Sequence, residues 1–435
     1  MADIAGIPYV EAQFDENGAI QNTADVTIPA GTTDLFVMSH GWNNSAGEAR
    51  DLYRGFFTSF SQVKPASLAG RQFAIVGVIW PSKKFDELVA VSGAPGDGTG
   101  AASLSAEDAA SLSLVTAKLD ALKTIFVKPE QQKTIDEAKA LVSDLEDKGS
   151  ARRAFADKIR SLLDPSAAGR EDASDTFFKD DGSELIQRLS VAEDDLGADI
   201  GGVSGSASLS LSVGSGTAVV GGAAGLGTYL SGVKAGAMNL LNYTTYYTMK
   251  ARAGAVGKNG VAPLVDKLAP QVERIHLIGH SFGGRVVTAT AASSKTDKIR
   301  SMTLLQAAFS HNGLSKTAKG FFRNVIDAKR VNGPILITHT KNDKAVGVAY
   351  PLASRINGDT AAAFGDENDK FGGMGRNGAQ QMGDGERVVG SLLASGSTYQ
   401  FKAGTCFNLE GSTFISGHSD VTGKEVAYAM ACAMG

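Results

Sequence analysis

Short apolar runs separated by longer amphipathic stretches dominate both ends of the sequence. An apolar run without polar alternation is typical of a strand buried on both faces, whereas apolar positions three and four apart are typical of a helix. The expected strands are 7–14, 34–39, 72–80, 275–278, 302–308, 334–340 and 398–402, and the expected helices include 48–60, 261–268 and 425–434. Strands that alternate with helices predict an α/β fold with a mostly parallel central sheet and helices on both faces.

The middle of the chain, residues 83–247, lacks this alternation and shows helical spacing instead. Ser105 and Asp108 resemble a capping box at the start of a first helix. Pro129 is suited to open a second helix, and Pro165 to stop a third. The pattern predicts a large, mainly helical cap inserted into an α/β core, with the divisions 1–82 (core), 83–247 (cap) and 248–435 (core).

Within the expected cap, residues 200–233 form a segment rich in Gly and Ser, and no charged residue occurs in it. This segment is only weakly hydrophobic, so a loop over the core is favoured over a lid that touches an apolar substrate or a lipid surface. Aromatic residues follow it directly. Of these, Tyr243 and Tyr246 are candidates to line a substrate pocket.

The pentapeptide Gly279-His280-Ser281-Phe282-Gly283 follows an apolar run and precedes a stretch of small residues. Strand, sharp turn and helix in that order lift a serine hydroxyl above the edge of a sheet, and the glycines leave room for the strained turn. The helix after the serine directs its first amides toward the place where negative charge develops. We therefore predict Ser281 as a nucleophile and the amide of Phe282 as one oxyanion donor.

A second oxyanion donor is expected on the loop after strand 34–39, where His40, Gly41 and Trp42 stand in sequence. A tetrahedral intermediate requires two N–H groups that converge on one oxygen, and a glycine lets the backbone approach closely. Trp42 is predicted to supply this second amide. His40 is expected to hold the loop by hydrogen bonding rather than to act in catalysis.

A serine hydroxyl becomes a strong nucleophile when a histidine takes its proton and a carboxylate orients that histidine. Asp343 directly follows strand 334–340, at the carboxyl end of that strand. His418 lies on a loop before the terminal helix and is the only histidine that follows Asp343. We predict Asp343 and His418 as the acid and the base that serve Ser281.

Other residues remain alternatives for roles in this site. His311 follows strand 302–308 and is a candidate to line the substrate pocket. The rival acids are Asp366, Asp369 and Asp384, and Asp420 is expected to cap the terminal helix instead. The acidic segment 366–372 lacks the ligand order of an EF-hand, which favours a solvated loop over a calcium site.

Taken together, these residues resemble the α/β-hydrolase superfamily of serine esterases and lipases, over residues 1–82 and 248–435. The stretch 39–44, Ser-His-Gly-Trp-Asn-Asn, is similar to one found in a bacterial subset of that superfamily. The resemblance implies that the chain cleaves carboxylic esters through an acyl-enzyme on Ser281, and we expect medium-chain or lipid-like acyl groups. The alternatives are a thioesterase, an acyltransferase, or a non-catalytic member of the fold that binds membranes or proteins.

Composition narrows the possible partners further. The chain of 435 residues has a net charge of −4, which provides no basic surface for nucleic acid. No zinc-ligand spacing, P-loop or Rossmann glycine pattern occurs, so no metal and no cofactor are expected. The expected partner is a small-molecule or lipid-like ester, and contact with a membrane surface stays open. Cys406 and Cys432 do not make a disulfide framework; they are expected to be buried apolar residues, and one bridge between them is the alternative. The first residues lack a basic and then apolar signal segment, so a cytoplasmic location is expected, with signal-less secretion as the alternative.

Overall fold

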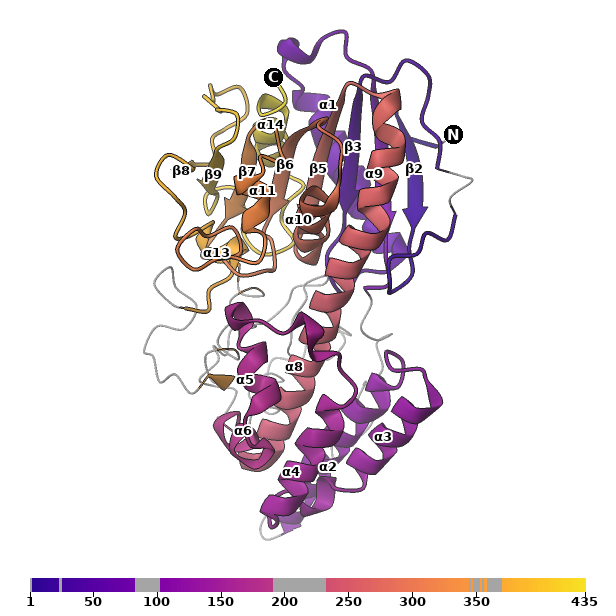
Figure 1. The fold of residues 1–435 in the computed structure, drawn as a ribbon, viewed down its shortest axis with the longest axis vertical. Coiled ribbons are helices and arrows are strands. Elements are labelled where there is room, and N and C mark those ends of the chain that lie inside the picture. The colour runs from indigo at the N-terminus through magenta and orange to yellow at the C-terminus, as the bar shows by residue number, and fades with distance from the viewer. Residues whose placement is uncertain are drawn as a thin grey trace.

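The computed structural model describes residues 2–22, 26–82, 102–190, 232–343 and 370–435, together with Val346, Ala353, Ile356 and Asn357. These residues form an α/β part around a central sheet and a lobe of helices that lies beyond one end of the strands (Figure 1). The lobe comes from the middle of the sequence, between the fourth and fifth strands.

In the described part, the sheet has nine strands in the order β1-β2-β4-β3-β5-β6-β7-β9-β8. β1 is antiparallel to β2, and the other neighbouring pairs are parallel. The strands are β1 (Ala2–Ile4), β2 (Ile7–Gln13), β3 (Asp34–Ser39), β4 (Phe73–Ile79), β5 (Arg274–His280), β6 (Ile299–Leu305), β7 (Ile335–His339), β8 (Arg387–Ser391) and β9 (Cys406–Glu410). The carboxyl ends of the parallel strands meet at one edge, and the helical lobe faces that edge (Figure 1). The predicted α/β class with a mostly parallel sheet is confirmed.

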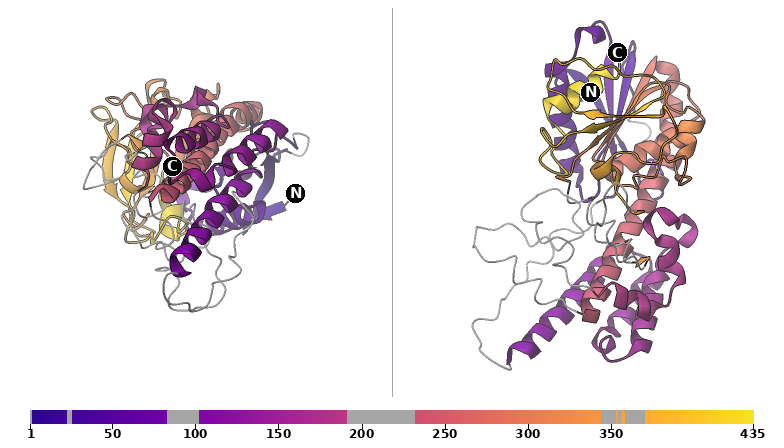
Figure 2. Two further views of the ribbon diagram at one scale, coloured as in Figure 1. Left: turned by 90° about the horizontal axis from the view of Figure 1, so that it is seen from below. Right: turned by 90° about the vertical axis from the view of Figure 1, so that its left-hand side faces the viewer.

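Helices cover both faces of this sheet (Figure 2). In β3, Phe36 and Val37 are both buried but point to opposite faces, because side chains alternate along a strand. Phe36 packs under one layer and Val37 under the other. The first layer contains α1 (Ala46–Val63) and α14 (Lys424–Cys432). The second contains the end of α8 (Gly232–Ala255), the π-helix η6 (Val256–Val261), α9 (Ala262–Leu268), α10 (Phe282–Ser293) and α11 (Arg323–Asp327).

The lobe packs around the first half of α8. Helices α2, α4 and α6 contact α8, and the second half of α8 packs against α10 while Tyr247 and Lys250 still contact the lobe. The described lobe elements are α2 (Ala102–Leu122), α3 (Pro129–Lys139), η2 (Val142–Asp144), α4 (Gly149–Arg160), η3 (Pro165–Ala167), η4 (Arg170–Asp172), α5 (Ser174–Lys179) and α6 (Gly182–Arg188). One continuous helix therefore joins the lobe to the sheet, and the expected boundary between residues 247 and 248 falls inside it. None of the described helices is long and apolar enough to cross a membrane.

Several predicted elements differ from the structure. Residues 398–402 are not a strand, although Tyr399 and Phe401 alternate with polar residues. These two rings stack on each other, and Phe401 packs on Phe407 of β9, so contact with the sheet accounts for the alternation. The last strand in the sequence is β9, and the strands β8, β9 and the antiparallel β1 were not predicted. Ser105 does not cap a helix, because α2 already begins at Ala102.

Of three further predictions, one can be compared with the structure and two fall outside the described residues. Cys406 and Cys432 are free thiols, as expected. The segment 200–231 of the Gly- and Ser-rich stretch lies outside the described residues. So do the alternative acids Asp366 and Asp369.

Candidate active site

A strained turn at Ser281 connects β5 to α10. The backbone of Ser281 has φ 56° and ψ −125°, in a region that residues with a side chain seldom adopt. A Cβ on Gly279 would lie 2.3 Å from the carbonyl oxygen of Gly283, and one on Gly283 would lie 2.1 Å from that of Ser39. Both glycines are therefore required by close backbone contacts, which is the role that the sequence analysis gave them.

Backbone hydrogen bonds hold this turn in place. The Ser281 amide donates to the carbonyl of Leu305 at 3.0 Å, and the Ser281 carbonyl accepts from the amides of Gly284 and Ala308 at 2.9 and 3.0 Å. The side chain of Ser281 is 1% exposed, and its Oγ has no hydrogen-bond partner within the described part of the chain. Because buried hydroxyls are nearly always paired, a rigidly held but unpaired one is typical of a functional position.

Asp343 and His418 form a buried pair at the same edge of the sheet. Asp343 follows β7, and its Oδ2 accepts a hydrogen bond from His418 Nδ1 at 2.9 Å. Its Oδ1 accepts from the amide of Val346 at 3.0 Å, so both carboxylate oxygens are engaged. A carboxylate oxygen accepts a hydrogen bond here and cannot donate one, so Nδ1 carries the hydrogen, which in a neutral imidazole leaves Nε2 as the acceptor. Among the described residues, that Nε2 has no hydrogen-bond partner.

The short loop that carries His418 is closed on itself by Asp420. The carboxylate of Asp420 accepts from the amide of Ser416 at 3.0 Å and from the hydroxyl of Ser416 at 2.8 Å. Asp420 does not cap the terminal helix, because the N-cap position of α14 is Gly423. The prediction of a helix cap was wrong, and Asp420 instead stabilises the turn around His418.

The loop after β3 lies directly against Ser281. A Cβ on Gly41 would be 2.6 Å from Ser281 Cβ and 3.1 Å from Ser281 Oγ. The next residue, Trp42, places its ring edge-to-face against Phe282, with the two ring centroids 5.7 Å apart. Residues 41–42 and 282 therefore flank the serine from two sides. Phe282 begins α10, where the first amides have no carbonyl partner inside the helix.

His40 holds this loop, as the sequence analysis expected. Its Nδ1 donates to the carbonyl of Gly41 at 2.9 Å, and its Nε2 accepts from the amide of Trp80 at 3.3 Å. The ring also stacks on Trp80 at 5.6 Å. Burial lowers the pKa of His40 to about 4, so the ring stays neutral and keeps this pattern of one donor and one acceptor. The far end of the loop is fixed where Ser45 and Glu48 cap α1 reciprocally.

The three candidate substrate residues lie in different surroundings. Tyr246 on α8 contacts Phe282, with ring centroids 5.6 Å apart, and so lies next to the serine. Tyr243 packs on Phe177 of the lobe and donates its hydroxyl to the carbonyl of Asp172 at 2.7 Å. His311 is fully buried, and its Nδ1 accepts from the Asn377 side chain at 3.2 Å. Of the three, Tyr246 has a described contact with a residue that flanks Ser281.

Sequence reasoning missed the segment 370–379, which covers the carboxyl ends of β6 and β7. The Gly375 amide donates to the carbonyl of Ala307 at 2.9 Å, and the Gly375 carbonyl accepts from the amide of Thr340 at 3.0 Å. Phe371 and Met374 are fully buried there. The glycines of this segment, which allow close backbone contacts, were the signal available in the sequence.

A buried charged cluster at the junction of lobe and sheet was also missed. Lys250 Nζ on α8 lies 2.6 Å from an Asp172 oxygen and 3.8 Å from a Glu171 oxygen. Arg285 on α10 lies 3.7 Å from Glu171 and donates its Nε to the carbonyl of Lys250 at 3.1 Å. We call these four residues, Glu171, Asp172, Lys250 and Arg285, the Lys250 cluster. It ties the lobe, α8 and α10 together one helical turn after Ser281.

A second serine–histidine–aspartate contact exists at the opposite edge of the sheet. Ser301 Oγ lies 2.8 Å from His276 Nδ1, and His276 Nε2 lies 3.1 Å from an Asp34 oxygen. Asp34 also accepts from Arg71 and Arg274, and all three members of the contact are fully buried. Because the Ser301 hydroxyl is already bonded and no strained turn presents it, this arrangement is structural.

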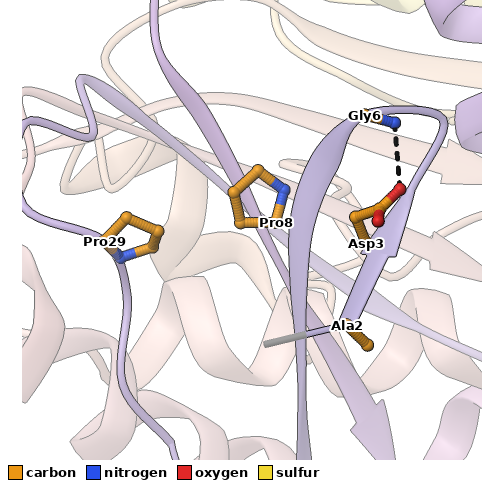
Figure 3. Close-up of a pocket in the computed structure, with 5 residues that line it drawn as sticks. All are labelled: Ala2, Asp3, Gly6, Pro8 and Pro29. Carbon is orange, nitrogen blue, oxygen red and sulfur yellow. Dashed lines mark hydrogen bonds between the residues drawn. The ribbon is translucent and has the colours of Figure 1, made fainter.

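Among the described residues, neither a cluster of metal-ligand residues nor the hollow at the N-terminal strands coincides with Ser281. In the parts of the chain that the structure describes, no three His, Cys, Asp or Glu residues lie close enough to hold a metal ion. A hollow of about 390 Å³ lies at the β1–β2 turn. Figure 3 shows that Ala2, Asp3, Gly6, Pro8 and Pro29 line it. The Asp3 carboxylate there accepts from the Gly6 amide at 3.2 Å, which stabilises the turn itself.

Comparison of the chain with protein-family models, with curated proteins and with solved structures gives no match. The geometry around Ser281 is therefore the basis from which the function is inferred.

Proposed function

We propose that this chain is a serine hydrolase of the α/β-hydrolase fold that cleaves carboxylic esters, with the helical lobe acting as its cap. The observation that carries the proposal is the combination of a strained, buried Ser281 with the Asp343–His418 hydrogen bond of 2.9 Å at the same edge of the sheet. Ser281 follows β5, Asp343 follows β7 and His418 follows β9, which is the chain order Ser, acid, His of such hydrolases.

In the proposed reaction, Ser281 Oγ attacks the ester carbonyl carbon while His418 Nε2 takes the hydroxyl proton. Asp343 fixes the ring with its proton on Nδ1 and stabilises the imidazolium that forms. The tetrahedral intermediate collapses, the alcohol leaves with the proton from His418, and an acyl-enzyme remains on Ser281. Water then attacks the acyl carbon with His418 as the base, and the carboxylic acid is released.

The negative charge on the carbonyl oxygen requires donors that are already in position. The amide of Phe282 at the start of α10 and the amide of Trp42 on the neighbouring loop are our candidates. Gly41 supports this assignment because its Cα lies against the Ser281 side chain, which brings the Trp42 loop close to the reacting atom. Such donors contribute about 10²–10³-fold to kcat each.

The side chains around the serine favour an apolar acyl group. Trp42, Phe282 and Tyr246 form a continuous aromatic contact, and each is at most 4% exposed. Each acyl CH₂ buried against such a surface gains about 0.8 kcal/mol. We therefore expect medium-chain p-nitrophenyl esters to exceed the acetate in kcat/KM by about tenfold or more. A preference for the acetate ester would contradict an apolar acyl site formed by these three rings.

The serine mechanism is tested by replacing Ser281 with Ala and measuring ester hydrolysis and covalent labelling by a fluorophosphonate probe. Labelling should be abolished and kcat should fall by about 10⁴-fold or more, while the protein stays folded, since one oxygen is removed. Ser301→Ala is the matched control, because it also removes a buried hydroxyl next to a histidine and should leave labelling intact. Near-parental turnover by folded Ser281→Ala would reject the mechanism.

A further inference from the structure

His280, the residue directly before Ser281, has a contact that the proposed reaction does not use. Its ring is 3% exposed and ends β5. His280 Nε2 lies 2.9 Å from the main-chain carbonyl oxygen of His418, and the two ring centroids are 5.0 Å apart. A carbonyl oxygen only accepts, so Nε2 carries the hydrogen and donates it. The strand that carries the nucleophile is thereby bonded to the backbone of the residue that we propose as the base.

We propose that His280 is a positioning residue, which holds His418 by its main-chain carbonyl and so sets the place of the His418 ring relative to Ser281. This inference rests on the proposed function. His418 is then fixed at two points: Asp343 holds its ring at Nδ1, and His280 holds its backbone. The bond to Asp343 limits rotation of the His418 ring, and the bond from His280 limits displacement of the His418 backbone.

The loop around His418 shows why the second contact matters. The contact between Asp420 and Ser416 closes the ends of that loop, but it does not reach the carbonyl of His418. The hydrogen bond from His280 attaches the middle of the loop to β5, which is the strand that ends at the nucleophile. A displacement of about 1 Å between reacting groups costs about 10²-fold in rate, so an attachment of this kind has a kinetic effect.

A histidine at position 280 can make this contact without disturbing the charge of the base. Burial lowers its pKa to about 3, so the ring stays neutral at the pH at which a histidine base works. A cation 5.0 Å from the His418 ring would oppose formation of the imidazolium. A neutral His280 donates this hydrogen bond from a rigid ring and places no positive charge beside the His418 imidazolium.

The test compares His280→Gln with His280→Met. The Gln amide can donate from about the position of Nε2, whereas Met has a similar length and no donor. We expect His280→Met to lower kcat by about 10–10²-fold with KM changed less than about twofold, and His280→Gln to recover most of that loss. Parental kcat in folded His280→Met overturns the proposal, and so does an equal loss in both variants.

A second measurement needs no turnover and separates this inference from the proposed function. In a Ser281→Ala background, proton NMR detects the low-field resonance of His418 Nδ1–H in its hydrogen bond to Asp343. We expect a sharp resonance with His or Gln at position 280 and a broadened or absent one with Met. A sharp resonance in the Met variant overturns the positioning role. A broadened resonance in the Met variant, found together with a parent chain that hydrolyses no ester, supports the positioning role of His280 and rejects the proposed ester hydrolysis.

If His280→Met fails to fold, His280→Asn replaces it in both measurements, because its shorter amide does not reach the carbonyl of His418. The expected results are the same, a loss of kcat and of the sharp resonance relative to His280→Gln. Parental kcat in His280→Asn overturns the proposal.

Discussion

Replacement of Gly41 by Ala tests whether the loop after β3 must lie against the nucleophile. The φ angle of Gly41 is outside the left-handed region, so alanine can adopt its backbone conformation. The added methyl group nevertheless meets Ser281. It would lie 2.6 Å from Ser281 Cβ and 3.1 Å from Ser281 Oγ, and 3.2 Å from the carbonyl oxygen of His280. The substitution therefore perturbs the site by contact alone and not by backbone strain.

The size of the effect follows from these distances. Non-bonded carbon atoms rest about 3.5–4.0 Å apart, so the loop or the serine must move by about 1 Å. A shift of about 1 Å at the reacting atoms costs about 10²-fold, and loss of one oxyanion donor costs about 10²–10³-fold. We expect kcat/KM of Gly41→Ala to fall by about 10²–10³-fold. Overpacking of this kind destabilises a fold by about 1–3 kcal/mol, so the protein should remain folded.

The assay is steady-state hydrolysis of a p-nitrophenyl ester, together with the rate of fluorophosphonate labelling and the melting temperature. Gly47→Ala is the matched control, because Gly47 is exposed at the start of α1 and the nearest atom to its added Cβ is Ser45 Oγ at 3.7 Å. This control should keep parental kcat/KM and match or exceed the parental melting temperature. Parental activity in Gly41→Ala would refute the close approach and, with it, the assignment of Trp42 as a donor.

Three further predictions concern the acid, the response to pH and the Lys250 cluster. Asp343→Asn should lower kcat by about 10⁴-fold with little change in KM, because the amide favours the wrong tautomer of His418; a larger loss in Asp384→Asn, measured by the same kinetics, would reassign the acid. Burial lowers the pKa of His40 to about 4 and that of His280 to about 3 from the ordinary 6.5, so the unfolded chain binds more protons and stability falls as the pH drops below 6.5. The loss should be on the order of 1 kcal/mol per pH unit for each ring, and urea midpoints that stay constant from about pH 7 to pH 5 would contradict it. Lys250→Met should lower the free energy of unfolding by about 3–5 kcal/mol, because Asp172 stays buried without its cation. The double change Lys250→Met with Asp172→Leu should recover part of this loss in urea unfolding, and no recovery would show that the charge pair is not the cause.

The residues around Ser281 could be predicted because each depends on local sequence. Gly279 is required by a contact with Gly283 inside the turn, whereas Gly283 is required by the approach of Ser39 from β3, and both stand in one five-residue pattern that identifies them. Asp343 was found from its place directly after strand 334–340, and His418 from its place on the loop before the terminal helix, although the strand expected before that loop was misplaced. Parallel strands end at a common edge, so the loops that follow β7 and β9 come together whatever lies between them in the sequence. The chemical roles of these residues stay predictions.

What the sequence did not predict depends on contacts between distant segments. The rings of Tyr399 and Phe401 have the alternation of a strand, but they pack over β9 from outside the sheet. A local pattern shows that these side chains are covered and does not show which segment covers them. Asp420 looked like a helix cap for the same reason: its position before α14 fits, yet its carboxylate is bonded to Ser416.

The relation between the lobe and the site follows from α8 and the Lys250 cluster. Tyr246, which contacts Phe282, and Lys250 lie one turn apart on the same helix. Arg285 holds the carbonyl of Lys250 from α10, the helix that begins next to Ser281. The contacts at Tyr246 and, one turn later, at Lys250 connect α8 to α10, so we expect the Tyr246 ring to keep its place beside the nucleophile turn. In the proposed enzyme, we therefore expect the rings of Trp42, Phe282 and Tyr246 beside Ser281 to form a fixed part of the substrate pocket.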